Sequence, residues 1–178
     1  MLEKYYPSEY AGSAYDIDYR RLYESGIRGI IFDVDNTLVH HGDDATPEAV
    51  QLFRDVHAIG FKTVLLTNND EERVTRFNAD IGTQYVCDAE KPAPEGYEKA
   101  LTLLGVQKNE ALVIGDQMFV DIIGANRCGI RSILVHYIEV PGEKWLGFRR
   151  YIEMLILLFF RISRRNTSGL SDNRERNT

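Results

Sequence analysis

Residues 29–38 read Gly-Ile-Ile-Phe-Asp-Val-Asp-Asn-Thr-Leu, and this is the most informative stretch of the sequence. Its apolar first half is typical of a buried strand, and two carboxylates follow it, Asp33 and Asp35. Because a strand turns alternate side chains to opposite faces, residues i and i+2 should share one face. Two neighbouring carboxylates repel each other unless a cation, a shared proton or a reaction uses them. We therefore expect a magnesium-dependent site at the carboxyl end of this strand.

Similar apolar runs alternate with helical patterns along the chain. Further strands are predicted over residues 62–67, 84–87, 111–115 and 130–136. Helices are predicted over residues 46–58, 70–79, 94–104 and 119–127. Strands that are apolar on both faces and alternate with helices indicate a parallel sheet covered on both sides. The predicted fold class is therefore α/β, with a three-layer, Rossmann-like parallel sheet.

The length of 178 residues and the hydrophobic fraction of 44% suit one domain with a substantial core. The predicted division is a helical segment packed on the core over residues 1–26, the sheet domain over 27–140, a basic amphipathic helix over 141–165 and a disordered tail over 166–178. The polar residues 40–45, which include His40 and His41, are predicted to form a solvated loop, with substrate contact as the alternative.

The two ends of the chain differ in charge. Residues 1–143 hold 13 basic and 24 acidic side chains, whereas residues 144–178 hold 8 basic and 3 acidic ones. From Trp145 to Arg165, arginines fall on one side of a helical projection and aromatic and leucine side chains on the other. Two interpretations stay open for this helix: it packs on the protein's own sheet, or it binds an anionic membrane surface.

The chain shows no export signal and no run approaching the roughly 20 apolar residues of a membrane span. Cys87 and Cys128 are predicted to be free thiols, which suits a reducing compartment. We therefore expect a cytoplasmic protein, located at the inner face of the membrane if the C-terminal helix binds lipid. No nucleic-acid partner is expected, and the sequence predicts no particular oligomeric state.

Polar residues follow three of the predicted strands. They are Asp33 and Asp35, then Thr67 and Asn68, then Asp116. An open parallel sheet binds its ligands beyond the carboxyl ends of its strands, so these side chains are expected to converge on one edge.

This set of residues fits phosphoryl transfer. Asp33 is the candidate nucleophile, because a carboxylate can attack phosphorus and form an aspartyl-phosphate. Asp35 is the candidate acid/base, which protonates the leaving oxygen and later activates water. Asp116 would complete an all-oxygen site for Mg²⁺, which offsets charge on the phosphoryl oxygens.

Four other polar residues extend the predicted site. Thr67 offers a hydroxyl and Asn68 an amide to a phosphoryl oxygen, and Lys91 supplies a positive charge. Asp121 lies five residues beyond Asp116 and is expected to orient Lys91 or a water bound to the metal.

Four ordered motifs resemble those of the haloacid dehalogenase (HAD) superfamily. They are DVDNTL at 33–38, LLTNN at 65–69, Lys91-Pro92, and GDQMFVD at 115–121. The resemblance covers residues 27–136, and the Asp-x-Asp form is similar to the phosphatases of that superfamily. It implies that residues 27–140 form a HAD-like phosphatase domain.

The resemblance also implies a role for each motif residue. Asp33 would be the nucleophile and Asp35 the acid/base. Thr67 and Lys91 would bind phosphate. The magnesium ligands would be Asp33, Asp116 and the backbone carbonyl of Asp35, with Asp121 as the second acid of the last motif.

The spacing between motifs leaves no room for an inserted cap domain. In this respect the chain resembles the capless members of the superfamily, subclass III. Short stretches such as Tyr-Tyr-Pro-Ser-Glu-Tyr at residues 5–10 resemble the bacterial YqeG proteins, which are related to mitochondrial phosphatidylglycerophosphate phosphatase. This relation implies a lipid phosphate substrate. Two alternatives stay open: a soluble phosphatase acting on a sugar phosphate, nucleotide or phosphoprotein, and a non-catalytic module that binds a partner through the phosphate site.

Overall fold

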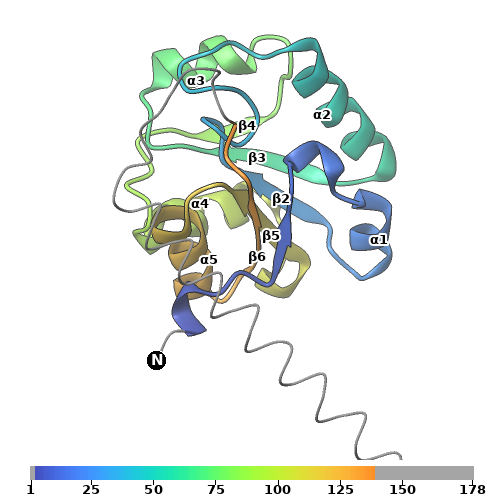
Figure 1. Ribbon diagram of the computed structural model, residues 1–178, viewed down its shortest axis with the longest axis vertical. Coiled ribbons are helices and arrows are strands. Elements are labelled where there is room, and N and C mark those ends of the chain that lie inside the picture. The colour runs from blue at the N-terminus through green and yellow to red at the C-terminus, as the bar shows by residue number, and fades with distance from the viewer. Residues whose placement is uncertain (1–2, 139–178) are drawn as a thin grey trace, which may run out of the picture.

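The computed structural model describes residues 3–138, and its centre is one parallel sheet of six strands (Figure 1). In spatial order the strands are β1 (Glu9–Ala11), β6 (Arg131–Val135), β5 (Ala111–Gly115), β2 (Gly29–Phe32), β3 (Lys62–Leu66) and β4 (Gln84–Val86). All neighbouring strands pair in parallel. The predicted α/β fold with a parallel sheet is confirmed.

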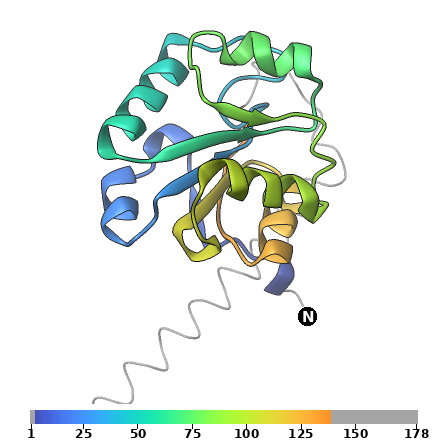
Figure 2. The ribbon, with the colours of Figure 1, turned by 180° about the vertical axis from the view of Figure 1, so that it is seen from behind.

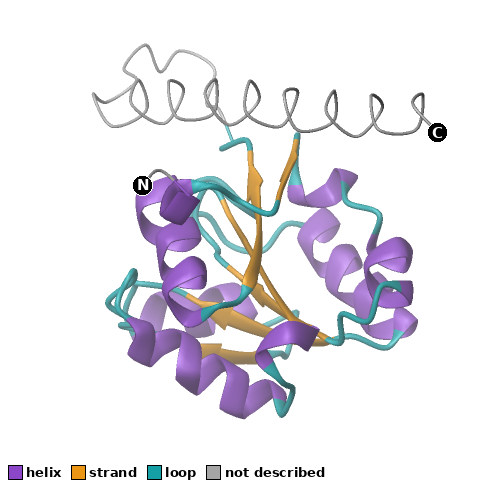
Figure 3. Cartoon of the chain, turned by 90° about the horizontal axis from the view of Figure 1, so that it is seen from below, coloured by secondary structure: helices purple, strands orange, loops and turns teal. Residues whose placement is uncertain are grey.

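Helices cover both faces of this sheet (Figures 1 and 2). One face carries α1 (Tyr19–Glu24), α2 (Pro47–Ile59) and α3 (Glu71–Asn78), and the other carries α4 (Pro94–Leu104) and α5 (Ile123–Cys128). Short helical turns complete the set: η1 (Glu3–Tyr5), η2 (Ala14–Asp16), η3 (Lys108–Glu110) and the π-helical turn η4 (Met118–Ile122). Figure 3 shows the strands running between the helical layers.

The central strand β2 shows why the sequence selects this arrangement. Ile30 and Phe32 pack with α1, α2 and α3, whereas Ile31 packs with α4 and α5. All three side chains are fully buried. A strand with apolar residues on both faces can avoid water only between two layers of helices.

Local signals set the bounds of α2 as the sequence predicts. The Thr46 side chain accepts a hydrogen bond from the Ala49 N–H (3.1 Å), and Pro47 occupies the first turn. Gly60 ends the helix in a left-handed conformation, with φ of 115°. A substituent there would also collide with the ring of Tyr23.

The order of the strands creates the position for a site. The chain passes from β2 outward to β3 and β4 on one side, and then returns to place β5 and β6 on the other. The carboxyl ends of β2 and β5 therefore lie side by side where the direction of winding reverses, with Phe32 opposite Ile114. Ligands of doubly wound sheets bind at this switch point.

The N-terminal segment differs from the helical entry that the sequence predicts. Residues 9–11 form β1, which pairs with β6, and only η2 and α1 of the following stretch are helical. The predicted helix over residues 119–127 also begins with η4, one residue earlier, before α5 continues it. Three residues are too few to show a strand pattern in the sequence. The strand β1 forms through its tertiary pairing with β6, which overrides local propensity.

The helix predicted over residues 141–165 and the tail over 166–178 lie outside the described residues. Among the described helices, none has the length and apolar character needed to cross a membrane. The connections from β2 to α2 and from β3 to β4 are fully described and hold no inserted domain.

Candidate active site

Asp33 lies directly beyond β2, at the centre of the switch point. Its backbone N–H donates to the Ile114 carbonyl (2.9 Å), so the β2–β5 ladder fixes its place. Its side chain accepts a hydrogen bond from Lys91 Nζ (2.6 Å) on Oδ1 and from Thr37 Oγ1 (2.9 Å) on Oδ2. Only 7% of the residue is exposed. Asp33 is therefore a buried carboxylate that retains a small opening to solvent.

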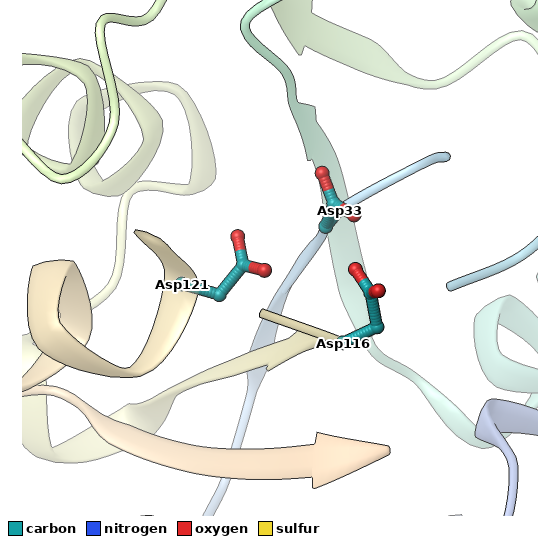
Figure 4. A group of neighbouring side chains, drawn as sticks. All are labelled: Asp33, Asp116 and Asp121. Carbon is teal, nitrogen blue, oxygen red and sulfur yellow. The ribbon is translucent and has the colours of Figure 1, made fainter. Parts of the chain in front are cut away.

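Asp116 and Asp121 join Asp33 in a cluster of three buried carboxylates (Figure 4). One oxygen of each lies within 4.8 Å of the others. Asp116 follows β5, and Asp121 is carried inward by η4, where the Gln117 N–H donates to its Oδ2 (3.1 Å). Gly115 leaves the space that Asp121 needs, because a Cβ on Gly115 would lie 2.4 Å from Asp121 Cγ.

Lys91 is the cation of this cluster. Its Nζ donates to Asp33 Oδ1 and to Asp121 Oδ1 (2.8 Å), and its side chain is 4% exposed. Burial, together with the charge of Asp121, raises the pKa of Asp33 to about 6 against the opposing effect of Lys91. Burial also raises the pKa of Asp121. Burial alone would lower the pKa of Lys91, but Asp121 and Asp33 overcome this effect and raise it.

The cluster carries an excess of negative charge that a divalent cation would neutralise. Three carboxylates face one ammonium, so full ionisation leaves two negative charges in a buried site, which is costly. The donor atoms are all carboxylate oxygens, the type that Mg²⁺ prefers. The residues present therefore fit this ion, with Asp121 in the cluster beside the predicted Asp33 and Asp116.

Asp35 lies outside this cluster and has a different set of partners. Three donors form hydrogen bonds with its carboxylate. They are the Gly42 N–H (3.2 Å) and Arg73 Nη2 (2.9 Å) on Oδ1, and Asn69 Nδ2 (2.7 Å) on Oδ2. His41 Nδ1 lies 3.1 Å from Oδ2 as an ion-pair contact. Burial alone would raise the pKa of Asp35, but Asn69, the Gly42 N–H and the Arg73 charge overcome this effect and lower it.

The residues after β3 approach the same edge. Thr67 Oγ1 accepts from the Asn69 N–H (3.1 Å) and from Asn69 Nδ2 (2.9 Å), and among the described residues its own proton finds no acceptor. That proton is free to reach a phosphoryl oxygen. Asn68 instead holds the Lys91 backbone, accepting from its N–H (2.7 Å) and donating to its carbonyl (3.3 Å). The phosphate-binding role of Asn68 stays a prediction.

Sequence reasoning does not place Thr37, Arg73 or Tyr97 in the site, and for His41 it offers only substrate contact as the alternative to a solvated loop. Thr37 binds Asp33 and also lies 3.5 Å from Asp116, and Arg73 and His41 bind Asp35. The Tyr97 hydroxyl faces the carbonyls of Val120 and Asp121 (3.2 and 3.3 Å). The position of Thr37 inside the first motif is a usable signal. No sequence spacing links Arg73 or Tyr97 to the motif residues.

The chain is similar to a known protein family and to named relatives. A model of haloacid dehalogenase-like hydrolases matches residues 41–129. The chain is 33% identical to the probable phosphatase YqeG of Bacillus subtilis (strain 168) over 159 residues, which cover 88% of this chain and 92% of that protein. It is 30% identical over 118 residues to the pyrophosphatase PpaX of Halalkalibacterium halodurans, covering 60% of this chain and 54% of the relative.

A solved structure shares the fold of this chain. NagD from E. coli K-12 superposes with a TM-score of 0.54 at 14% identity, over 69% of this chain and 94% of the NagD chain. At this identity the likeness concerns the fold alone.

Proposed function

The chain belongs to the haloacid dehalogenase-like hydrolase family, and from this premise we propose that it is a magnesium-dependent phosphomonoester hydrolase. The name of the Bacillus subtilis relative, a probable phosphatase, supports this reaction class. The connections after β2 and β3, which lack an inserted domain, support a capless member with an open site.

In the first half of the proposed reaction, an oxygen of Asp33 attacks phosphorus in line. A bond forms between that oxygen and phosphorus as the bond to the leaving alcohol breaks, and the product is an aspartyl-phosphate. Asp35 gives its proton to the departing oxygen. Lys91 and the Thr67 hydroxyl hold phosphoryl oxygens. Mg²⁺ bound at the three-carboxylate cluster would offset the charge of those oxygens.

In the second half, water attacks the phosphorus of the aspartyl-phosphate. Asp35, now ionised, takes a proton from that water, and the bond between phosphorus and Asp33 breaks. Inorganic phosphate leaves, Asp33 is regenerated, and Asp35 again carries the proton that it needs for the next turnover.

The observation that carries this proposal is the unequal treatment of the two carboxylates. Asp33 stands beside two other carboxylates and one ammonium, which suits a nucleophile that works next to a divalent cation. Asp35 stands apart with three hydrogen-bond donors and the His41 ring beside it. The donors around Asp35 lower its pKa and favour the ionised form, which suits the base of the second half. The proton that Asp35 gives to the leaving oxygen is the one that it took from water in the preceding turnover.

Replacement of the nucleophile tests the proposal. We expect Asp33→Asn to keep the fold and to lose phosphate release from p-nitrophenyl phosphate with Mg²⁺ by on the order of 10⁴-fold or more. Asp80→Asn, which changes an exposed carboxylate next to α3, is the matched control and should retain full turnover. A fully active Asp33→Asn enzyme would refute the nucleophile assignment.

For the substrate we propose phosphatidylglycerophosphate, presented at an anionic membrane. The basic residues and the aromatic side chains between Trp145 and Arg165 support this choice, and so does the excess of basic over acidic side chains in residues 144–178. An open site also suits a headgroup that stays at the membrane surface. The non-catalytic module predicts instead a protein that releases no phosphate from any ester.

Liposomes separate the lipid proposal from a soluble phosphatase. We expect the full chain to float with vesicles containing phosphatidylglycerol and to release phosphate from phosphatidylglycerophosphate in them. Shortening the chain to residues 1–143 should abolish flotation and lipid turnover, and turnover of p-nitrophenyl phosphate should remain. Unchanged lipid turnover in the shortened chain would instead favour a soluble phosphatase.

A further inference from the structure

The surroundings of Asp35 include a contact that the proposed reaction does not yet use. The residues 40–44, here called the Asp35 loop, leave the first motif and cross in front of Asp35. From this loop the Gly42 N–H donates to Asp35 Oδ1, and His41 Nδ1 lies 3.1 Å from Oδ2. Two further donors come from the opposite side, Asn69 just before α3 and Arg73 within it. The carboxylate is therefore held between two walls.

Arg73 ties these walls together with one atom. Its Nη2 donates to Asp35 Oδ1 (2.9 Å) and to the Asp43 carbonyl in the loop (2.6 Å). Arg76, one turn further along α3, also holds the loop, through the Gly42 carbonyl and the Asp44 carboxylate. Arg76 makes no contact with Asp35, and half of its side chain is exposed.

Burial of the Arg73 side chain costs free energy that an exposed residue holding the same loop would not require. Its side chain is 12% exposed and its guanidinium lies over the Phe77 ring, 5.8 Å from the centroid. Within the described residues, its Nε and Nη1 are buried without a hydrogen-bond partner. Unsatisfied polar atoms of a buried charge are unfavourable, and each such group calls for an explanation. Arg76 holds the same loop from a half-exposed position and avoids most of this cost.

We propose that Arg73 is a positioning residue that fixes the orientation of Asp35 for proton transfer. Without its guanidinium, Oδ1 loses its charged donor. The loop keeps its contacts with Arg76 but loses its buried tie at the same time, so we expect the second donor on Oδ1, the Gly42 N–H, to be held less firmly. Oδ2 keeps Asn69, and the carboxyl group pivots about that remaining contact. This inference rests on the proposed phosphatase reaction.

A misdirected acid affects substrates unequally, which separates positioning from a merely structural role. An alkyl phosphate has a poor leaving group and depends on the proton from Asp35, whereas p-nitrophenolate leaves readily without it. We expect Arg73→Gln to lower kcat/KM for glycerol phosphate by about 10–100-fold, a fraction of the effect of general acid catalysis. The kcat/KM for p-nitrophenyl phosphate should change little, because this ratio reports only the steps up to departure of the leaving group. The kcat for both substrates should fall alike, because hydrolysis of the aspartyl-phosphate uses Asp35 as the base whichever alcohol has left.

Two further variants sharpen the test. Arg73→Lys should restore most of the alkyl phosphate turnover, because one ammonium can donate to both acceptors that the single Nη2 now serves. Arg76→Gln is the matched control on the same helix and the same loop. It should stay within about twofold of the wild type on both substrates, as expected for an exposed ion pair. Hydrogen exchange of the Gly42 amide should accelerate in Arg73→Gln.

The outcomes are separable. Equal losses of kcat/KM on both substrates in Arg73→Gln, or no loss of kcat/KM on either, would overturn the positioning role. If Arg73→Gln fails to fold, the wild type with Mg²⁺ and beryllium fluoride decides the question by crystallography. The Nη2 contact with Asp35 should persist in that complex, and an Arg73 turned toward the fluoride would overturn the inference. A wild type inactive on both substrates would instead refute the proposed function.

Discussion

Asp33 and Asp35 are two residues apart, yet their surroundings differ in almost every respect. Asp33 is nearly fully buried, shares one ammonium with Asp121, and has its pKa raised to about 6. Asp35 is partly accessible, accepts three hydrogen bonds, has His41 as an ion-pair contact, and has its pKa lowered. The same residue type therefore receives opposite electrostatic treatment within one short stretch.

The backbone explains how this difference arises. The strand β2 ends at Phe32, so the alternation that would place both carboxylates on one face does not continue. Asp33 stays in register with β5, whereas Asp35 pairs with Val39 in an isolated bridge that turns the chain toward the Asp35 loop. The sequence predicts that the carboxylates of Asp33 and Asp35 lie side by side and repel each other. This is wrong, because the carboxylates beside Asp33 are those of Asp116 and Asp121. The lesson is that side-chain environment, more than spacing, assigns the roles.

The strongest way to break the comparison is to neutralise Asp35 alone. We expect Asp35→Asn to lower steady-state turnover by about 10³-fold, within the range for general acid–base catalysis. With a good leaving group, the first step should survive while hydrolysis of the aspartyl-phosphate fails, because no base activates water. Rapid-quench detection of a phosphorylated enzyme is the measurement. Rapid turnover without accumulation would assign the base to another residue.

The next largest effect is expected from a substitution beside the carboxylate cluster that contains Asp33. Gly115→Ala places a Cβ 2.4 Å from Asp121 Cγ, in a buried site with no space to spare. Overpacking of this kind costs about 1–3 kcal/mol of unfolding free energy, measured by urea denaturation. Displacement of Asp121 should also remove stabilisation by Mg²⁺.

The control for Gly115→Ala is Gly12→Ala. There the added Cβ meets only Asp16 Oδ2, at 3.3 Å, and the site lies far along the chain from the carboxylate cluster. Equal unfolding free energies for both variants, with Mg²⁺ stabilisation retained in both, would contradict the role assigned to Gly115.

A smaller, pH-dependent effect should distinguish the two carboxylates directly. The pKa of Asp33 in the metal-free folded protein is raised from 3.8 to about 6. Its contribution to stability is therefore fully present below pH 3.8 and is lost as the pH rises through 6. Mg²⁺ requires the ionised form, so stabilisation by Mg²⁺ should weaken below pH 6 by about 1.4 kcal/mol per unit for one displaced proton.

Thermal unfolding with and without Mg²⁺ between pH 5 and pH 8 measures this linkage. Asp116→Asn should show little Mg²⁺ stabilisation at any pH in that range. A pH-independent response to Mg²⁺ in the wild type would show that the ion does not compete with a proton on Asp33.

The smallest expected effect concerns the helix that supports Asp35. Asp70 caps α3 by accepting from the Arg73 N–H (2.9 Å). Asp70→Ala should lower the unfolding free energy by about 1 kcal/mol, the usual loss for an N-cap. Asp70→Ser keeps a capping oxygen and should recover most of it. Stabilisation by Mg²⁺ should be unchanged in both Asp70 variants, because the cap of α3 supports Asp35 and not the carboxylate cluster that contains Asp33.

Much of this arrangement can be predicted from the sequence. Strands β2, β3 and β5 are apolar on both faces, and helix signals separate them, so a parallel sheet follows from composition and order. The residues Asp33, Thr67 and Asp116 follow those strands, and strand topology brings them to one edge. Motif and strand context agree at these positions, which is why the prediction is specific.

The rest depends on tertiary contacts that leave no pattern in the chain. Arg73 reaches Asp35 across 38 positions, and the Tyr97 hydroxyl reaches the η4 carbonyls across more than 20. The entry of Asp121 into the carboxylate cluster depends on the π-helical turn, whose extra residue per turn changes where its side chain points. The sequence indicates a helix there and does not distinguish its type.

The pairing of β1 with β6 joins residues near opposite ends of the described chain, with Glu9 opposite Ile133. During synthesis, the sheet can gain this border strand only after residue 135 has left the ribosome, although β1 itself is made first. Until β1 pairs with it, the newly formed β6 presents unpaired backbone groups along one side. Such an open edge invites association between chains. β1 thus covers the edge of β6 and, with only three residues, leaves a shorter edge in its place.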